Sequence, residues 1–125
     1  MIQYEVDENS KTVKCTISRE YTIGDLIKKD ARKANTSFSL VFQDEQVPKV
    51  YVGIAKYHPD EANSFSIEIG KEIARKKAFA KYYDDMKKNM SKVMQELAIL
   101  QDRIRFAFFE YDSAQRDIFA VLKDY

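Results

Sequence analysis

Residues 71–125 read KEIARKKAFAKYYDDMKKNMSKVMQELAILQDRIRFAFFEYDSAQRDIFAVLKDY, a run of 55 residues with neither glycine nor proline. Glycine loosens the backbone and proline removes an N–H donor, so the absence of both favours a helix. Good helix formers, among them alanine, lysine, leucine and glutamate, are abundant in the run. The stretch therefore predicts that the second part of the chain, residues 65–125, is helical.

An apolar seam follows this helical part. Alternate steps of four and three residues from Phe79 meet an apolar or aromatic residue every time: Phe79, Tyr83, Met86, Met90, Val93, Leu97, Leu100, Ile104, Ala107, Tyr111, Ala114, Ile118, Val121 and Tyr125. This spacing is typical of a coiled coil. We predict a homo-oligomer, a dimer or higher, and leave open whether the seam is filled within the chain or between chains.

The expected length of this helix suggests that it bends. An unbroken helix of this length would be several times longer than the radius of a domain of this size. We therefore expect two long helices, with the break near residues 89–91 or near residues 101–102.

The first part of the chain, residues 1–64, is typical of a small antiparallel sheet. Residues 1–6 and 12–18 alternate apolar and polar side chains across a polar link, which predicts a hairpin. Residues 37–43 and 50–57 are the next two expected strands, and residues 23–34 form either a short helix or a charged loop. The simplest arrangement is a four-stranded meander, so the predicted class is α+β: about four strands, then the two long helices.

The composition limits the number of domains, the location of the protein and its class of partner. The chain has 125 residues, 45% of them hydrophobic and 33% charged, with a net charge of +1. The length fits one domain, residues 1–125, and no apolar run is long enough to span a bilayer. We expect a cytoplasmic protein with no membrane partner. The single cysteine excludes an internal disulfide, and the near-neutral charge disfavours a generic nucleic-acid coat protein.

The sequence contains few of the side chains and motifs that catalysis commonly uses. The chain has one histidine, His58, and one cysteine, Cys15, and none of the common phosphate-loop, zinc or nucleophile-elbow motifs. Cys15 falls on the apolar face of its strand, so we expect a buried, inert thiol. We predict a binding protein with no metal and no cofactor, and keep an enzyme with His58 as its base as a third hypothesis.

The helical part carries a basic stripe. Between Lys71 and Lys92 eight basic residues stand against three acidic ones, whereas residues 110–125 have two basic and four acidic. Such a stripe could bind nucleic acid, the phosphates of a nucleotide, or another protein. Alternatively, it is a solvated helix face whose lysine stems shield the apolar seam.

Two resemblances add context. Residues 52–61 read VGIAKYHPDE and are followed by an aromatic, a glycine and an alanine-rich helix start, at Phe65, Gly70, Ile73, Ala74, Lys77 and Ala78. This pattern resembles small phage and prophage proteins. The resemblance implies a phage-encoded protein in the cytoplasm of the infected bacterium.

The layout of an N-terminal antiparallel sheet and long C-terminal helices is similar to that of the phage anti-Thoeris proteins. These are oligomeric sponges that sequester a cyclic ADP-ribose signal made by a bacterial TIR-domain defence enzyme. The family binds its ligand with an aromatic residue and an asparagine on a helix, and with arginines of the neighbouring subunit. The resemblance implies that Phe79 stacks on the base, that Asn89 hydrogen-bonds to it, and that Arg103 and Arg105 neutralise phosphate.

Overall fold

The computed structural model describes residues 1–36, 46–56 and 66–125, and it divides the chain into two compact units, residues 1–86 and 87–125. Its elements in chain order are β1 (Ile2–Asp7), β2 (Thr12–Arg19), α1 (Ile23–Lys33), β3 (Lys49–Lys56) and α2 (Ile67–Leu122). The predicted α+β class is confirmed.

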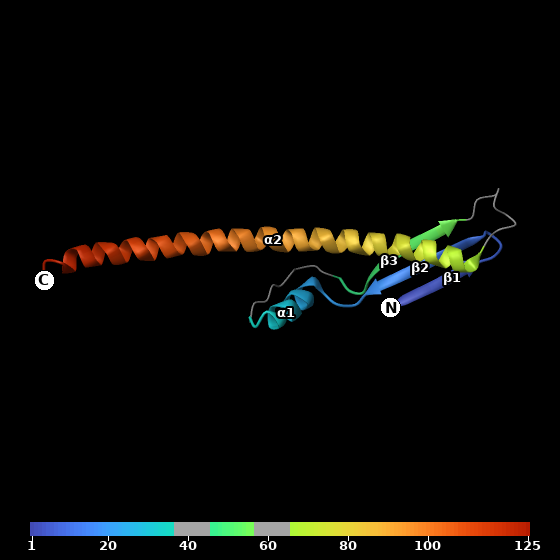
Figure 1. The fold of residues 1–125 in the computed structure, drawn as a ribbon, viewed down its shortest axis with the longest axis horizontal. Coiled ribbons are helices and arrows are strands. Elements are labelled where there is room, and N and C mark those ends of the chain that lie inside the picture. The colour runs from blue at the N-terminus through green and yellow to red at the C-terminus, as the bar shows by residue number, and fades with distance from the viewer. Residues whose placement is uncertain (37–45, 57–65) are drawn as a thin grey trace. The chain divides into compact units, whose positions relative to one another are not determined.

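The sheet has three antiparallel strands in the order β1-β2-β3 (Figure 1). In the β1–β2 hairpin, Tyr4 lies opposite Cys15 and Val6 opposite Val13, so the apolar residues of both strands share one face as predicted. The link closes with Lys11 at a φ of 53°, while Asp7 Oδ1 accepts the N–H groups of Asn9 and Ser10.

The predicted meander is wrong in one respect. It would have placed the strand expected at residues 37–43 between the strands now seen as β2 and β3. Instead β2 pairs directly with β3, with Cys15 opposite Gly53 and Ile17 opposite Tyr51. The expected strand itself lies outside the described residues.

Residues 23–34, for which a helix and a loop were both open, form the helix α1. Thr22 caps its N-terminus: the Thr22 hydroxyl accepts the N–H of Asp25, and the Asp25 carboxylate accepts the N–H of Thr22. This capping box satisfies two N–H groups that a helix start otherwise leaves unpaired.

The expected break into two long helices is also wrong, because α2 is continuous through residues 89–91 and 101–102. Sharp kinks in helices occur almost always at proline, at Gly/Ser pairs or at bulges. The polar residues Asn89, Ser91, Gln101 and Asp102 each keep a backbone N–H donor. They lower helix propensity by tenths of a kcal/mol, which is too little to end a helix.

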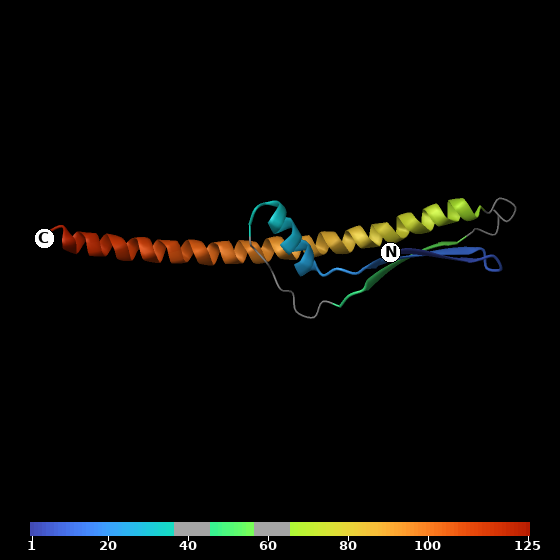
Figure 2. The same cartoon turned by 90° about the horizontal axis from the view of Figure 1, so that it is seen from below.

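The core of the first unit lies where the first turns of α2 run along one face of the sheet (Figure 2). Small residues make the contact close. A Cβ on Gly53 would overlap the carbonyl oxygen of Ala74 and lie 2.5 Å from the nitrogen of Ala78. Only a glycine permits this approach of helix backbone to strand. The fully buried core residues around it are Val13, Cys15, Ala74 and Ala78.

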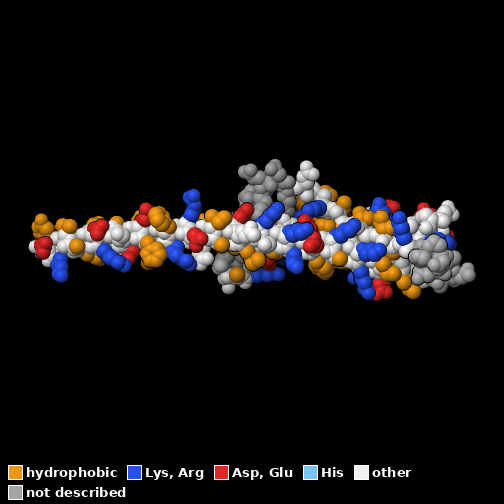
Figure 3. All heavy atoms as spheres, turned by 90° about the horizontal axis from the view of Figure 1, so that it is seen from above, with side chains coloured by type: hydrophobic (Ala, Val, Ile, Leu, Met, Phe, Trp, Pro, Cys, Tyr) orange, Lys and Arg blue, Asp and Glu red, His pale blue; other side chains and the backbone are white. Residues whose placement is uncertain are grey.

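The second unit has no comparable core of its own. It consists of the rest of α2 and the last residues of the chain, and none of residues 94–125 is buried. Figure 3 shows hydrophobic side chains spread along this C-terminal part of the helix. Those exposed by more than half include Ile104, Phe106, Phe108, Phe109, Tyr111, Ile118, Phe119, Val121 and Leu122.

Candidate functional site

An open groove on α2, within the first unit, combines aromatic rings with cations. Its volume is about 490 Å³, and its walls are Glu72, Arg75, Lys76, Phe79, Ala80 and Tyr83. These positions are three or four residues apart, so they share one face of the helix. We call this feature the Phe79 groove.

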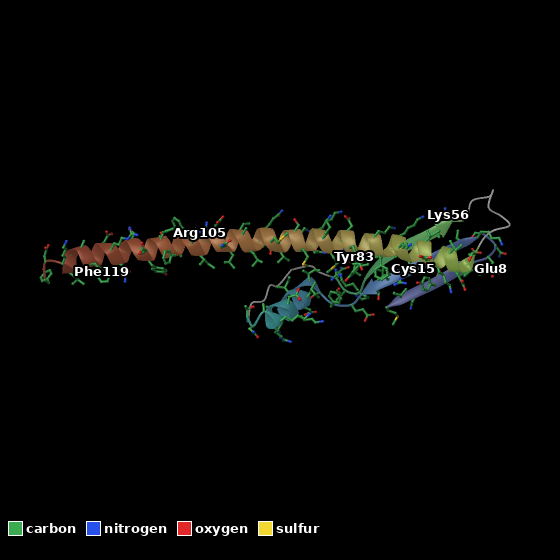
Figure 4. All side chains as sticks on the ribbon, in the orientation of Figure 1. Glu8, Cys15, Lys56, Tyr83, Arg105 and Phe119 are labelled. Carbon is green, nitrogen blue, oxygen red and sulfur yellow. The ribbon has the colours of Figure 1, made fainter. Side chains whose placement is uncertain are left out.

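Phe79 and Tyr83 form the apolar wall of the groove. Their rings stack with centroids 5.8 Å apart and an interplanar angle of 28°. Phe79 packs against the core of the first unit, whereas Tyr83 is 61% exposed and projects from α2 (Figure 4). A ring anchored in the core beside an exposed ring gives a flat apolar ligand a fixed surface to stack on.

Arg75 and Lys76 carry the positive charge of the groove. The Arg75 guanidinium lies 5.4 Å from the centroid of the Phe79 ring, in cation–π geometry. Lys76 makes an ion pair of 3.1 Å with Glu72, and both side chains are largely exposed. Exposed pairs of this kind contribute little stability, so Lys76 can exchange Glu72 for another anion at small cost.

A polar network holds α2 to the sheet just beyond the groove. The Arg19 guanidinium, only 3% exposed as a residue, donates to the hydroxyl of Tyr51 and to the carbonyl of Tyr21. Asp85 on α2 accepts hydrogen bonds from the Tyr51 hydroxyl and, at 2.9 Å, from Lys49 Nζ. We call these residues the Arg19–Asp85 clamp.

Hydrogen bonds, charges and burial in and around the clamp shift the pKa values of Asp85 and of the neighbouring Tyr82. Burial alone raises the pKa of Asp85, but the hydrogen bonds from Tyr51 and Lys49 and the charges of Lys49 and Arg19 lower it below its ordinary value. The hydrogen bond with Tyr21, and then burial, raise the pKa of Tyr82 to about 12. Tyr82 stands edge-on to Tyr51 of the clamp and to both groove rings, so it connects the clamp to the wall of the groove.

The four predicted ligand residues fall in different places. Phe79 lies in the groove of the first unit, and Asn89, Arg103 and Arg105 lie on α2 in the second unit. Fourteen residues of helix separate Asn89 from Arg103, a rise of about 21 Å. Arg103 and Arg105 are two residues apart and so project roughly 200° apart around the helix. A single chain therefore does not bring these three side chains to one ligand.

Arg75 and Lys76 were predicted only as members of the basic stripe between Lys71 and Lys92, and neither was singled out beside Phe79. The available signal was their spacing, because they precede Phe79 by four and three residues and so share its helix face. Among the other cations of the stripe, Lys77 and Lys81 donate to the backbone carbonyls of β3.

The two residues weighed for catalysis do not join the groove. Cys15 is fully buried in the core, and burial raises the pKa of its thiol, as expected for an inert side chain (Figure 4). His58 lies outside the described residues. Within residues 1–36, 46–56 and 66–125, no three histidine, cysteine, aspartate or glutamate side chains gather as metal ligands.

No protein-family model matches the chain, and the searches of curated proteins and of solved structures returned no match either. Over the described part of the chain, none of the helices combines the length and the apolar character needed to cross a bilayer.

Proposed function

We propose that this chain is an oligomeric binding protein that sequesters a nucleotide-derived signal of the cyclic ADP-ribose type, and that a phage uses it against a bacterial defence. The observation that carries the proposal is the Phe79 groove, which places two stacked rings beside two cations. Such a ligand has both parts that this surface fits: a flat base for the rings and a diphosphate for the cations.

The base stacks on the exposed ring of Tyr83, whose other face Phe79 supports, and the diphosphate binds Arg75 and Lys76. Arginine forms paired hydrogen bonds to phosphate oxygens, whereas lysine acts as a point charge. The groove lies on one helix and is open, so a second chain closes it. Arg103 or Arg105 of the second chain contributes a phosphate contact, as the resemblance to the sequestering family implies for its arginines, whereas Asn89 is expected on the same helix as Phe79.

The exposed apolar seam of residues 87–125 supports an oligomer. Residues such as Ile104 and Ile118 are about 60% exposed although they stand at the seam positions of a coiled coil. Contiguous exposed apolar surface of this kind marks protein–protein contact. The second copy of the chain is the simplest partner for a self-complementary seam.

Calorimetry with cyclic ADP-ribose isomers tests the proposal. Tyr83→Ala is expected to weaken binding about tenfold, because stacking on one ring contributes about 1–3 kcal/mol. Arg75→Gln is expected to weaken it by at least as much. Tyr125→Ala and Lys87→Gln remove a tyrosine ring and a positive charge outside the groove and serve as controls. Equal loss in the controls, or no heat with any isomer, contradicts the proposal.

Heat denaturation of the loaded protein separates binding from catalysis. A sequestering protein returns the intact cyclic ligand to solution. An enzyme, the hypothesis that used His58 as its base, returns products. Recovery of intact ligand in stoichiometric amount supports our proposal that the chain is not an enzyme.

The second candidate function is binding of nucleic acid or another protein through the face between Lys71 and Lys92. The exposed apolar side chains of the second unit favour a protein partner. In the first unit, however, Lys77 and Lys81 are hydrogen-bonded to β3, which leaves fewer cations for phosphate. A nucleic-acid partner predicts affinity that falls steeply with salt and a shifted duplex in a gel.

A further inference from the structure

The two outer edges of the sheet differ in how their backbone groups are used. At the β3 edge, the lysine side chains of α2 cap the carbonyls: Lys77 Nζ donates to the oxygen of Ile54 at 3.0 Å, and Lys81 Nζ to that of Val52 at 2.6 Å. Lysines over an edge strand block pairing with another strand. We call this pair of contacts the lysine cap.

The β1 edge is the other one, and its register identifies the exposed groups. The Ser18 N–H donates to the carbonyl of Met1, and the Met1 amine donates back to Ser18, so this is a hydrogen-bonded pair. Such pairs alternate along antiparallel strands. The N–H and C=O groups of Ile2, Tyr4 and Val6 therefore point away from β2. Within residues 1–36, 46–56 and 66–125 no strand pairs with them.

The side chains of the same three residues are unusually exposed for an apolar row. Ile2, Tyr4 and Val6 share the face of the sheet that carries the core, yet they are 42%, 39% and 37% exposed. Beside them lies an open groove of about 650 Å³ whose walls include Val6, Ile67 and Lys71. An unpaired edge next to exposed apolar side chains is a template for strand addition.

We propose that the outer edge of β1 pairs antiparallel with β1 of a second copy of this chain, about a two-fold axis at Tyr4. Ile2 then lies opposite Val6 of the second copy and Tyr4 lies opposite Tyr4. Each of these pairs exchanges two N–H···O bonds. The apolar rows of the two copies join into one, which buries surface that each copy exposes alone.

Charge selects this register over its neighbours. With the axis at Tyr4, Gln3 faces Glu5 of the second copy, so an amide donor meets a carboxylate acceptor in both halves. A shift that places the axis at Glu5 sets two carboxylates directly opposite each other, which destabilises a strand pair. A shift to Gln3 leaves Val6 outside the ladder. The pairing is isologous, so it closes as a two-fold dimer.

Disulfide trapping tests the register. Residues Gln3 and Glu5 of opposite copies form a non-hydrogen-bonded pair, with Cα atoms about 4.5 Å apart, inside the range for a disulfide. Full-length Gln3→Cys and Glu5→Cys chains, one of them ¹⁵N-labelled, are mixed in glutathione buffer and analysed by mass. The mixed disulfide is expected to exceed each homodisulfide at least tenfold. Equal yields overturn the proposal.

A proline variant shows that the backbone edge makes the contact. Val6→Pro removes an outward N–H without breaking the β1–β2 ladder, because the Val6 groups do not point to β2. It is expected to cut the mixed disulfide at least tenfold, whereas the matched Val6→Ala preserves it. An unchanged yield in Val6→Pro overturns the proposal. Ligand affinity at the Phe79 groove is read separately, so failure of either proposal leaves the other standing.

Discussion

The two units of this chain solve the burial of apolar side chains in opposite ways. Residues 1–86 bring a sheet and a helix together around Gly53, Ala74 and Ala78, and the small residues let the two backbones touch. Residues 87–125 carry large apolar side chains, among them Phe108 and Ile118, and leave most of them exposed. Apolar content alone therefore does not make a core. A second surface must face it, and only the first unit contains one.

The largest effect is expected from Gly53→Val, which breaks the first unit. The new side chain meets the backbone of α2, which cannot move aside without separating from the sheet. We expect a loss of more than about 4 kcal/mol in the free energy of unfolding. Thermal unfolding followed by circular dichroism measures it. Ile54→Val, at a neighbouring exposed position, is the control and is expected to cost less than about 0.5 kcal/mol.

Ile104→Asp is expected to break the association of the second unit. A charge in an apolar seam costs several kcal/mol when the seam is buried by a partner and little when it is exposed. Light scattering is expected to show a lower mass for the variant than for the wild-type oligomer of 14.6 kDa chains. Gln95→Asp, on the same helix but off the seam, leaves the mass unchanged. A monomeric wild-type protein contradicts the proposed oligomer.

Asp85→Asn is expected to loosen α2 from the sheet in the first unit, because it removes the charge that faces buried Arg19. Asp85 is 23% exposed, so the cost is reduced by solvent, and we expect about 2 kcal/mol. Urea unfolding measures it. Glu72→Gln removes an exposed ion pair and is expected to cost less than about 0.5 kcal/mol. Equal losses mean that the clamp does not hold α2 to the sheet.

The pH dependence gives the smallest effect. The folded Tyr82 keeps its proton to about pH 12, whereas the unfolded side chain releases it near its ordinary value of 10. Its contribution to stability is therefore complete below pH 10 and is lost as the pH rises toward 12. Tyr82→Phe is expected to flatten this fall in melting temperature. At the acid end, the lowered pKa of Asp85 means that its contribution is lost only as the pH falls below the ordinary aspartate range.

The sequence predicts local structure well and long-range contacts poorly. The hairpin face of Ile2, Tyr4 and Val6 follows from alternation, and the helical character of residues 71–125 from composition. The direct pairing of β2 with β3 does not, because a strand order depends on contacts across about 35 intervening residues. The continuity of α2 was missed because helix length was judged against the size of a folded monomer.

In the candidate site, too, local features could be predicted from the sequence and long-range contacts could not. Phe79 was named as a ligand residue from the resemblance to a known family, and its neighbours Arg75 and Lys76 share its helix face by spacing. The Arg19–Asp85 clamp was not, since its partners are 66 residues apart in sequence and no local pattern links them. The match of Gly53 to Ala74 and Ala78 is equally invisible until the helix is seen on the strand.

The lysine cap on β3 has a consequence for the size of any assembly built on this sheet. A sheet with two unpaired edges can add copies without limit, as in a fibre. A sheet with one blocked edge stops growing after a single pairing. Lys77 and Lys81 therefore prevent a further strand from pairing with β3. If both lysines were neutralised, for example by acetylation, each chain would have two edges available for strand pairing. A closed dimer would then become an open-ended assembly.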